Sequence, residues 1–169
     1  MKLNNLVAKH AKMMKEKGWD EEKRSKAELH MLMITEIAEA SEEVRGGKLS
    51  YYEEDGKPEG EAIELADLCL RIMHRFSDKG WDLDDAILGR RSVFHYHIEG
   101  YSPLEFHHRL AKIIILASEV EEKDCLAAIV HLCDLWCHAM SFPILLEDAI
   151  RGKMKYNQTR PYRHGGKKL

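Results

Sequence analysis

The chain has 169 residues, which is enough for one domain or for two small repeats that share one core. Its 44 % hydrophobic and 33 % charged residues, with only 4 prolines, are typical of a folded, helix-rich protein and exclude collagen-like and disordered classes. The net charge of -3 lacks the basic surplus of most nucleic-acid binders, so no nucleic acid polymer is expected as a partner.

No apolar stretch approaches the roughly 18 residues of a membrane helix, so no membrane partner is expected. The first residues contain no hydrophobic signal region, which favours a soluble, cytoplasmic protein. In that compartment cysteines stay reduced, and three of the four lie in an apolar helical pattern that suits a small hydrophobic side chain. The four are Cys69, Cys125, Cys133 and Cys137.

Hydrophobic periodicity predicts helices throughout the first half of the chain. The predicted ranges are about 2–17, 21–45, 60–78 and a short helix that ends near residue 88. Gly18 and Gly46 are expected to end the first two helices, and Asp20 is expected to cap the second. A polar loop should follow to about residue 60, and Asp82 or Asp84 should cap the fourth helix. Since no strand pattern is present, an all-α fold is predicted.

The second half of the chain resembles the first in three places. LDDAILGR at 83–90 returns as LEDAIRGK at 146–153, ELADLC at 64–69 returns as HLCDLW at 131–136, and EIAEASEE is similar to ILASEVEE. These matches predict a single domain over 1–169 built from two tandem, diverged helical-hairpin repeats. The expected parts are repeat one at about 21–90, a linker at about 91–105, repeat two at about 106–155 and a basic tail at 151–169.

Five carboxylates fall on or beside apolar helix faces. Glu36 and Glu43 lie on the apolar stripe of the second helix and Glu39 lies at its edge. Glu64 and Asp67 share one face of the third helix. Buried carboxylates need a compensating cation, which can be Arg, Lys or a metal ion. Oxygen ligands from two antiparallel helices are typical of Mg²⁺ or Mn²⁺ sites rather than Zn²⁺ sites. A solvated acidic face without a metal is the alternative interpretation.

The same residues carry a resemblance to a known family. TEIAEASEE at 35–43, with 24 residues between Glu39 and Glu64 and then ELAD, resembles the ExxE and ExxD signature of the MazG-like all-α nucleoside triphosphate pyrophosphohydrolases. KMKYNQTRPYRHGGKK at 153–168 is similar to the tail of many members. The resemblance covers about 29–90 and 106–168, and implies a MazG-like helical bundle related to the dimeric dUTPases.

This resemblance implies hydrolysis of a nucleoside triphosphate, commonly a deoxy one, to the monophosphate and pyrophosphate. It implies two or three Mg²⁺ ions, with Mn²⁺ as a substitute, on four metal ligands: Glu36, Glu39, Glu64 and Asp67. Glu39 and Glu43 are the expected catalytic residues. Glu43 lies one turn after Glu39, where it could be a further ligand or could orient the attacking water.

The segment 151–169 contains 7 Lys and Arg residues and no acid, so phosphate is its natural target. The resemblance implies that it supplies the substrate-binding side chains Lys153, Tyr156, Asn157 and Arg160. Trp19 is the first candidate for recognition of the base and Trp81 is the alternative. A solvated chain end is the other interpretation of this segment.

Only one site per chain is expected. Alignment of ASE at 40–42 with ASE at 117–119 places Ile113, Leu116 and Val120 where the carboxylates of the second helix stand, so these positions are predicted to be core and the second half to be scaffold. A polar cluster in that half is expected to be structural, because its cysteines and its other members lie on different helix faces. Its members are His131, Cys133, Asp134, Cys137 and His138.

Two other functional classes remain open. A non-enzymatic helical module could keep this fold and bind a partner through its acidic face. A di-iron carboxylate bundle is disfavoured, because only Glu105 and His108 form the Glu-x-x-His spacing that such proteins use twice. A homodimer or a higher homo-oligomer is expected, since a thin pair of helical hairpins leaves apolar faces uncovered.

Overall fold

The computed structural model describes residues 2–19, 24–90, 98 and 100–162. Seven helices account for 71 % of these described residues, and the sheet within them is one small hairpin, which confirms the prediction of a mostly helical chain. The helices are α1 (Asn4–Glu16), α2 (Lys26–Arg45), α3 (Glu61–Lys79), α4 (Leu83–Arg90), α5 (Pro103–Leu116), α6 (Glu122–Ala139) and α7 (Leu146–Thr159). The strands are β1 (Tyr52–Glu54) and β2 (Lys57–Glu59).

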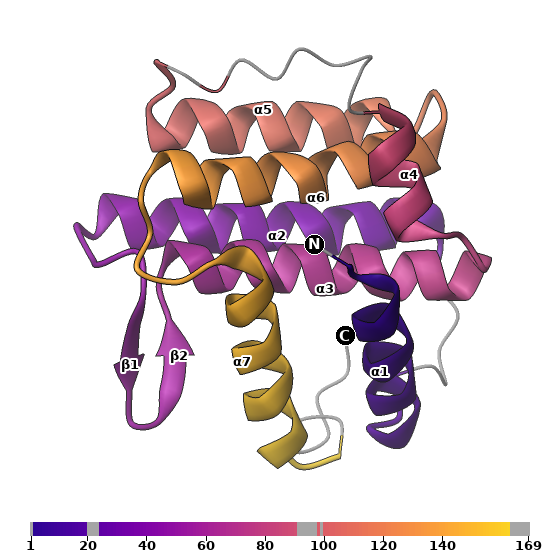
Figure 1. Ribbon diagram of the computed structural model, residues 1–169, viewed down its shortest axis with the longest axis horizontal. Coiled ribbons are helices and arrows are strands. Elements are labelled where there is room, and N and C mark those ends of the chain that lie inside the picture. The colour runs from indigo at the N-terminus through magenta and orange to yellow at the C-terminus, as the bar shows by residue number, and fades with distance from the viewer. Residues whose placement is uncertain (1, 20–23, 91–97, 99, 163–169) are drawn as a thin grey trace.

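Four long helices lie side by side and form the body of the molecule (Figure 1). Helix α2 packs against α3 and α5, and α6 packs against the same two helices. The shorter helices cover this bundle: α4 packs against α6, whereas α1 and α7 pack against α3. Because α3 is surrounded on several sides, nearly its whole first half is buried, including Glu61 and Glu64.

The two outer long helices begin in the same way. At α2, Ser25 and Glu28 form a capping box, so the helix begins later than predicted, and Asp20 lies outside the described residues. At α5, Ser102 and Glu105 form the same capping box inside the predicted linker 91–105, of which residues 91–97 and 99 lie outside the described residues. Each of these helices therefore has an N-cap that satisfies its first backbone amides.

The other end of the chain also differs from the sequence-based prediction. Helix α7 continues to Thr159, so it includes the first residues of the predicted basic tail. Lys153 in this helix is buried. The helix extends past the predicted end of repeat two near residue 155 because no Pro or Gly stands between Lys153 and Thr159 to stop it.

The predicted polar loop between α2 and α3 contains a two-stranded hairpin instead. Its strands pair antiparallel, with Tyr52 opposite Glu59. The turn is Asp55 and Gly56, with φ of 51° and 75°, which is the Asp-Gly turn that favours hairpins. The strands have three residues each, which is too short for an alternating pattern to stand out, so the turn dipeptide was the available signal.

Helix α5 does not bury the residues that the repeat alignment placed in the core. Leu116 and Val120 are 47 % and 51 % exposed, and Ile113 is only half-buried. The buried side is Leu110 and Ile114 instead. The prediction was wrong because the contacts of α5 with α2 and α6 determine which of its faces is covered, and the helix ends before Val120.

A polar network joins the start of α6 to α2 and α3. His30 Nδ1 lies 3.0 Å from Ser118 Oγ, and its Nε2 lies 3.2 Å from Glu122 Oε1. Arg75 donates two hydrogen bonds of 2.9 Å to the same carboxylate. The network therefore joins the helix pair α2 and α3 to the helix pair α5 and α6, which is distant from it in sequence.

A second network joins the start of α3 to α5 and α6. His107 Nδ1 lies 3.0 Å from Ser41 Oγ, and its Nε2 lies 3.1 Å from Glu61 Oε1. Trp136 Nε1 donates a hydrogen bond of 2.9 Å to the same oxygen. In both networks the acceptor is a Glu at the first position of its helix, where the helix dipole favours negative charge.

Within the described part of the chain, no helix is both long enough and apolar enough to cross a bilayer. All four cysteines are buried free thiols.

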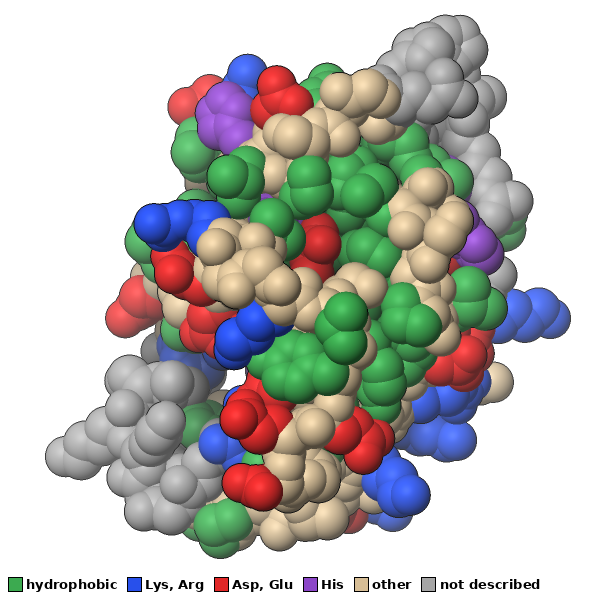
Figure 2. All heavy atoms as spheres, turned by 90° about the vertical axis from the view of Figure 1, so that its left-hand side faces the viewer, with side chains coloured by type: hydrophobic (Ala, Val, Ile, Leu, Met, Phe, Trp, Pro, Cys, Tyr) green, Lys and Arg blue, Asp and Glu red, His purple; other side chains and the backbone are tan. Residues whose placement is uncertain are grey.

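Hydrophobic side chains gather on the end of the bundle where α5 begins and α6 ends (Figure 2). Exposed Leu104 and Met140 belong to these two helix ends.

Candidate functional site

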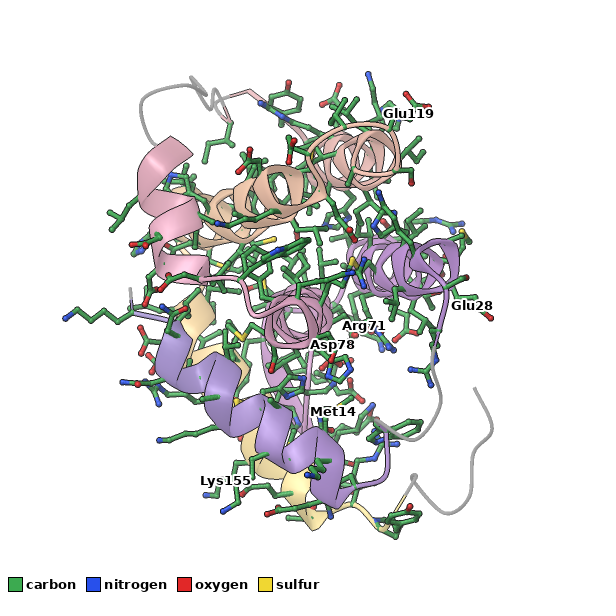
Figure 3. All side chains as sticks on the ribbon, turned by 90° about the vertical axis from the view of Figure 1, so that its right-hand side faces the viewer. Met14, Glu28, Arg71, Asp78, Glu119 and Lys155 are labelled. Atoms are coloured by element: carbon green, nitrogen blue, oxygen red, sulfur yellow. The ribbon has the colours of Figure 1, made fainter. Side chains whose placement is uncertain are left out.

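A cavity of about 480 Å³ lies between α1, α2, α3 and the end of α7. Along α3 its lining runs from Glu64 and Asp67 through Arg71 to His74. Viewed along the long helices, Arg71 points from α3 into the space between α2 and α1, and Met14 borders that space from α1 (Figure 3). The volume suits a small-molecule ligand. A second hollow, on the outer face of α5, is more open and is lined by a mixture of basic, acidic and apolar side chains.

Three of the predicted metal ligands lie together at one part of this cavity. Glu36, Glu64 and Asp67 each offer a carboxylate oxygen, and these oxygens all lie within 4.8 Å of one another. Glu36 comes from the buried stripe of α2, and the other two are one turn apart on α3. Among the residues that the structure describes, this is the one group of three or more such side chains at metal-binding distance.

Burial and mutual repulsion disfavour the charged form of these acids. Burial and the nearby Asp67 raise the pKa of Glu64 to about 8. Burial also raises the pKa of Glu36 to about 7, although Arg71 opposes this shift. The pKa of Asp67 is raised by burial against the opposing effect of Lys153. Carboxyls with such pKa values are typical of sites that exchange protons for a cation.

Two buried or half-buried cations already face the cluster. Arg71 donates a short hydrogen bond from Nε to Glu36, and Lys153 Nζ lies 2.7 Å from Asp67 Oδ2. Burial would lower the pKa of Lys153, but Asp67 and Glu64 outweigh it and hold that pKa above its ordinary value. The same cavity is also lined by Lys17, Arg24, Lys57 and Arg160, so its cations outnumber its four acids, Glu36, Glu39, Glu64 and Asp67.

The donor set fits a hard divalent cation. All the candidate ligands are carboxylate oxygens, which Mg²⁺ and Mn²⁺ prefer. Glu64 Oε2 is buried and has no hydrogen-bond partner among the described residues. Glu39 is exposed and lines the cavity, but it does not belong to the group within 4.8 Å. Glu39 therefore lies outside the compact group that the other three predicted ligands form.

The structure does not bring Glu43 to the cavity. Its carboxylate accepts a hydrogen bond of 3.0 Å from the hydroxyl of Tyr52 and lies 3.2 Å from Lys48 Nζ. Tyr52 belongs to β1, the strand that periodicity did not predict. Glu43 thus fixes the hairpin to the end of α2, and it is not among the cavity-lining residues.

The predicted substrate-binding residues divide into two groups. The residues that line the cavity are Trp19, Lys153, Asn157 and Arg160. Tyr156 is not among the lining residues, and its ring lies 6.0 Å from the guanidinium of Arg160. Trp81 packs edge-on against Phe76 at 5.4 Å, beside the core.

The sequence analysis missed seven charged or polar residues that line the cavity: His10, Lys17, Arg24, Thr35, Lys57, Arg71 and His74. Arg71 lies one turn after Asp67 on the same helix face, which was a usable signal for a counter-ion. His10 also lines the cavity, but in the sequence it falls on the apolar stripe of α1 and reads as a core residue. Only its neighbours in space distinguish it from a packed histidine.

The ends of α1 and α7 are joined beside the cavity. Lys17 donates hydrogen bonds to the backbone carbonyls of Gln158 and Arg160 at the end of α7. Gly18 has a φ of 74°, and a side chain there would meet the ring of Tyr162 at 2.2 Å. Trp19 and Arg160, which adjoin these contacts along the chain, both line the cavity.

The predicted polar cluster of α6 does not line this cavity. Cys133 and Cys137 are buried, and His138 Nε2 lies 3.9 Å from Asp134 Oδ1.

Comparison with known protein families, curated proteins and solved structures finds no match to this chain. The functional assignment therefore rests on the chemistry of the cavity.

Proposed function

We propose that the protein is a Mg²⁺-dependent nucleoside triphosphate pyrophosphohydrolase of the MazG-like class, with Mn²⁺ as a substitute metal. The reaction is hydrolysis of a nucleoside or deoxynucleoside triphosphate to the monophosphate and pyrophosphate. The observation that carries the proposal is a group of three carboxylates, of which Glu36 and Glu64 are buried and Asp67 is half-buried, in a cavity that also contains cationic side chains.

Each side chain has a role in this proposal. Glu36, Glu64 and Asp67 hold the metal, and Glu39 completes the ligand set from the open side. Bound metal ions neutralise phosphate charge and act as Lewis acids at phosphorus. Because the metal occupies the carboxylates, the phosphate oxygens that the metal does not bind contact cations that line the same cavity. These cations and polar groups are Arg71, Lys153, Asn157 and Arg160.

The architecture of two tandem repeats is part of the proposal, and the two polar networks support it. Each network contains a histidine from one outer helix, a serine from the other outer helix or the turn that follows it, and a glutamate at the first position of an inner helix. The residues of the α2 segment have the same spacing as those of the α5 segment. They are Ser25, His30 and Ser41 in the first and Ser102, His107 and Ser118 in the second.

The inner helices correspond as well. Glu61 and Glu122 begin α3 and α6, and Gly80 and Ser141, with φ of 63° and 50°, follow at the same position after them. This correspondence differs from the sequence match of ELADLC with HLCDLW. It places Ala128 at the position of Asp67, which supports a single metal site per chain.

Self-association is also proposed, with a second copy of the chain covering exposed hydrophobic side chains such as Met140 and Leu104. Size-exclusion chromatography with light scattering tests it. A dimer mass that falls to the monomer mass in Met140→Glu supports this face as the interface. A monomer mass for the unchanged chain contradicts it.

The activity is tested by incubating the pure protein with Mg²⁺ and each common NTP and dNTP, including dUTP. Ion-exchange chromatography separates monophosphate and pyrophosphate from diphosphate and phosphate. Glu64→Gln should reduce turnover at least 100-fold, since it removes a charged ligand from the cluster. Glu42→Gln is the matched control, because Glu42 lies on α2 but is exposed and paired with Arg45.

The release of pyrophosphate that depends on Glu64 and not on Glu42 supports the proposal. The absence of turnover with both Mg²⁺ and Mn²⁺ contradicts it. The alternative is then the non-enzymatic partner-binding module. Equal loss in both variants would assign the effect to the removal of a negative charge in general rather than to the metal cluster.

A further inference from the structure

Lys57 of β2 is a charged cavity residue that the proposed chemistry does not use. Among the described residues, it is the one part of the hairpin that lines the cavity. Its side chain is 42 % exposed, so a ligand in the cavity can reach it. The ammonium group is paired with the carboxylate of Glu59 and has no other partner in the described part of the chain. Since an ammonium carries three N–H donors, donors are left for a ligand.

The hairpin holds Lys57 in a defined place relative to α3. Pro58, the next residue of the strand, is buried. Gly60 has a φ of 106°, and a Cβ there would lie 2.7 Å from the carbonyl oxygen of Ser50. The amide of Ala62, in the first turn of α3, donates a hydrogen bond of 2.9 Å to the same carbonyl. The base of the hairpin is therefore fixed to the start of α3, the helix that carries two of the proposed metal ligands.

The proposed metal ligands lie between two ends of the cavity. The hairpin and α1 lie on opposite sides of α7 along the length of α3 (Figure 1). The hairpin leads into the start of α3, whereas His10 of α1 meets His74, near the end of α3, edge-on at 6.3 Å. Glu64 stands roughly 15 Å before His74 along the helix axis. We call these the hairpin end, at Lys57, and the α1 end, at His10 and His74.

The two ends differ in chemistry. The apolar lining residues come from α1 and the segment after it, from the first half of α2 and from α3 beyond Asp67, so they all belong to the α1 end. They are Met13, Met14, Trp19, Leu29, Leu32, Met33 and Leu70. Arg24 and Arg160 also line the cavity, but at the hairpin end no described apolar residue offers a surface on which a base can pack. The hairpin end offers the ammonium of Lys57 instead.

We propose that Lys57 binds the terminal phosphate of the triphosphate, so that the substrate lies across the metal ligands with its pyrophosphate part toward the hairpin and its base toward α1. This inference rests on the proposed function, which leaves the direction of the substrate open. The physical reason is that a charge-assisted hydrogen bond from a reachable ammonium favours the phosphate with the most negative charge. Lys57 keeps one N–H on Glu59 and donates the others to phosphate oxygens.

Inorganic pyrophosphate is the probe for the hairpin end, and titration calorimetry with Mg²⁺ present measures its binding without turnover. Lys57→Met should weaken pyrophosphate binding by roughly 10-fold or more, since it removes a charged hydrogen bond. Binding of the common nucleoside monophosphates should change by less than about twofold, because their phosphate lies at the metal ligands. In turnover, KM of the triphosphate should rise as pyrophosphate affinity falls. Lys57→Arg keeps the charge and should restore most of the affinity.

Two controls separate phosphate binding from a role in the hairpin itself. Glu59→Gln breaks the same ion pair but keeps the ammonium, so pyrophosphate affinity should stay the same or rise. Lys48→Met removes a lysine that bonds Glu43 and Tyr52 and is not among the lining residues, so it should leave the affinity unchanged. Exposed ion pairs contribute little to stability, so all these variants should fold, which circular dichroism checks.

The outcomes distinguish this inference from the proposed function. Pyrophosphate that does not bind, affinity that is unchanged in Lys57→Met, or equal weakening in either control overturns the role of Lys57. Turnover to monophosphate and pyrophosphate would then leave the function standing. Weakening of monophosphate binding as large as that of pyrophosphate overturns the direction of the substrate. The absence of turnover overturns the function, whereas pyrophosphate binding that depends on Lys57 would still support the phosphate contact.

Discussion

Lys153 Nζ lies 2.7 Å from Asp67 Oδ2, and both side chains are largely buried. The contact joins α7 to α3, two helices that are far apart in the chain. It neutralises one carboxylate of a cluster in which burial disfavours charge on every member. The contact therefore contributes both to the stability of the helix bundle and to the electrostatics of the site.

Replacement of Lys153 tests this dual role. Lys153→Met should lower the free energy of unfolding by about 3 kcal/mol in EDTA, because it leaves a buried acid without its cation. Mg²⁺ should restore part of that loss, which thermal unfolding with and without the metal measures. Lys155→Met, an exposed change on the same helix, is the control. Equal stability of the two variants would show that the ion pair contributes nothing.

The stability of the metal-free protein should depend on pH in a specific direction. The pKa values of Glu36 and Glu64, about 7 and about 8, lie above those of the unfolded chain, so the folded state binds the extra protons. Their contribution is complete below the unfolded pKa and is lost as the pH rises through 7 to 8.

In EDTA we therefore expect the Tm to fall on the order of 5 to 10 °C between pH 5 and pH 9. Glu64→Gln should flatten this dependence, and Mg²⁺ should reduce it, because the metal binds the deprotonated form. Differential scanning calorimetry across this range provides the measurement. A Tm that rises with pH would contradict the assignment of raised pKa values.

Arg71 should set the pH at which the metal binds. Burial raises the pKa of Glu36, and the guanidinium of Arg71 opposes that shift. Arg71→Met should raise the pKa further, so that the midpoint of Mn²⁺ affinity against pH moves upward by about one unit. Titration calorimetry between pH 6 and pH 9 measures this midpoint. Arg71→Lys keeps the charge and should shift it less; identical midpoints in both variants would exclude the electrostatic role.

The network at the start of α3 should matter for stability and not for the site. Glu61 accepts hydrogen bonds from Trp136 and is bonded to His107, all three buried. Glu61→Gln should cost about 1 kcal/mol in urea unfolding, because the amide oxygen can keep both hydrogen bonds but is a weaker acceptor than a carboxylate oxygen. Its kcat/KM should equal that of the exposed control Glu119→Gln. A loss of activity at unchanged stability would instead connect this network to the cavity.

Substitution of Gly18 should disturb the contact between the segment after α1 and the segment after α7, beside the cavity. An alanine at Gly18 would be strained at a φ of 74° and would meet Tyr162 at 2.2 Å, whereas Gly47, with a φ of 65°, faces open space. Gly47→Ala should cost only the strain, about 1 kcal/mol. Gly18→Ala should cost more and should also raise KM severalfold, because Arg160 follows the displaced segment. Equal effects of both variants on Tm and KM would exclude a role for the Tyr162 contact.

Much of the fold could be predicted from local patterns. Hydrophobic periodicity located the first three helices to within a few residues, because burial of one face repeats every 3.6 residues along a helix. The same periodicity placed Glu36 on the buried stripe of α2, where it lies. The spacing of Glu64 and Asp67 placed them on one face of α3. Periodicity did not predict the short β-hairpin, because its strands are too short for a pattern. It also did not predict which face of α5 is buried, because that face depends on the neighbouring helices.

The sequence by itself determined that the chain forms helices, that Glu36 lies on the apolar face of one of them, and that Glu64 and Asp67 share a face of another. The tertiary structure alone decided which cations meet them, since Arg71 and Lys153 reach the cluster only through the packing of α3 against α2 and α7. It also decided that Glu43 bonds Tyr52, and that His10 lines a cavity. The physical reason is that periodicity specifies which side of a helix is buried, whereas the partner of a buried group depends on how distant helices pack.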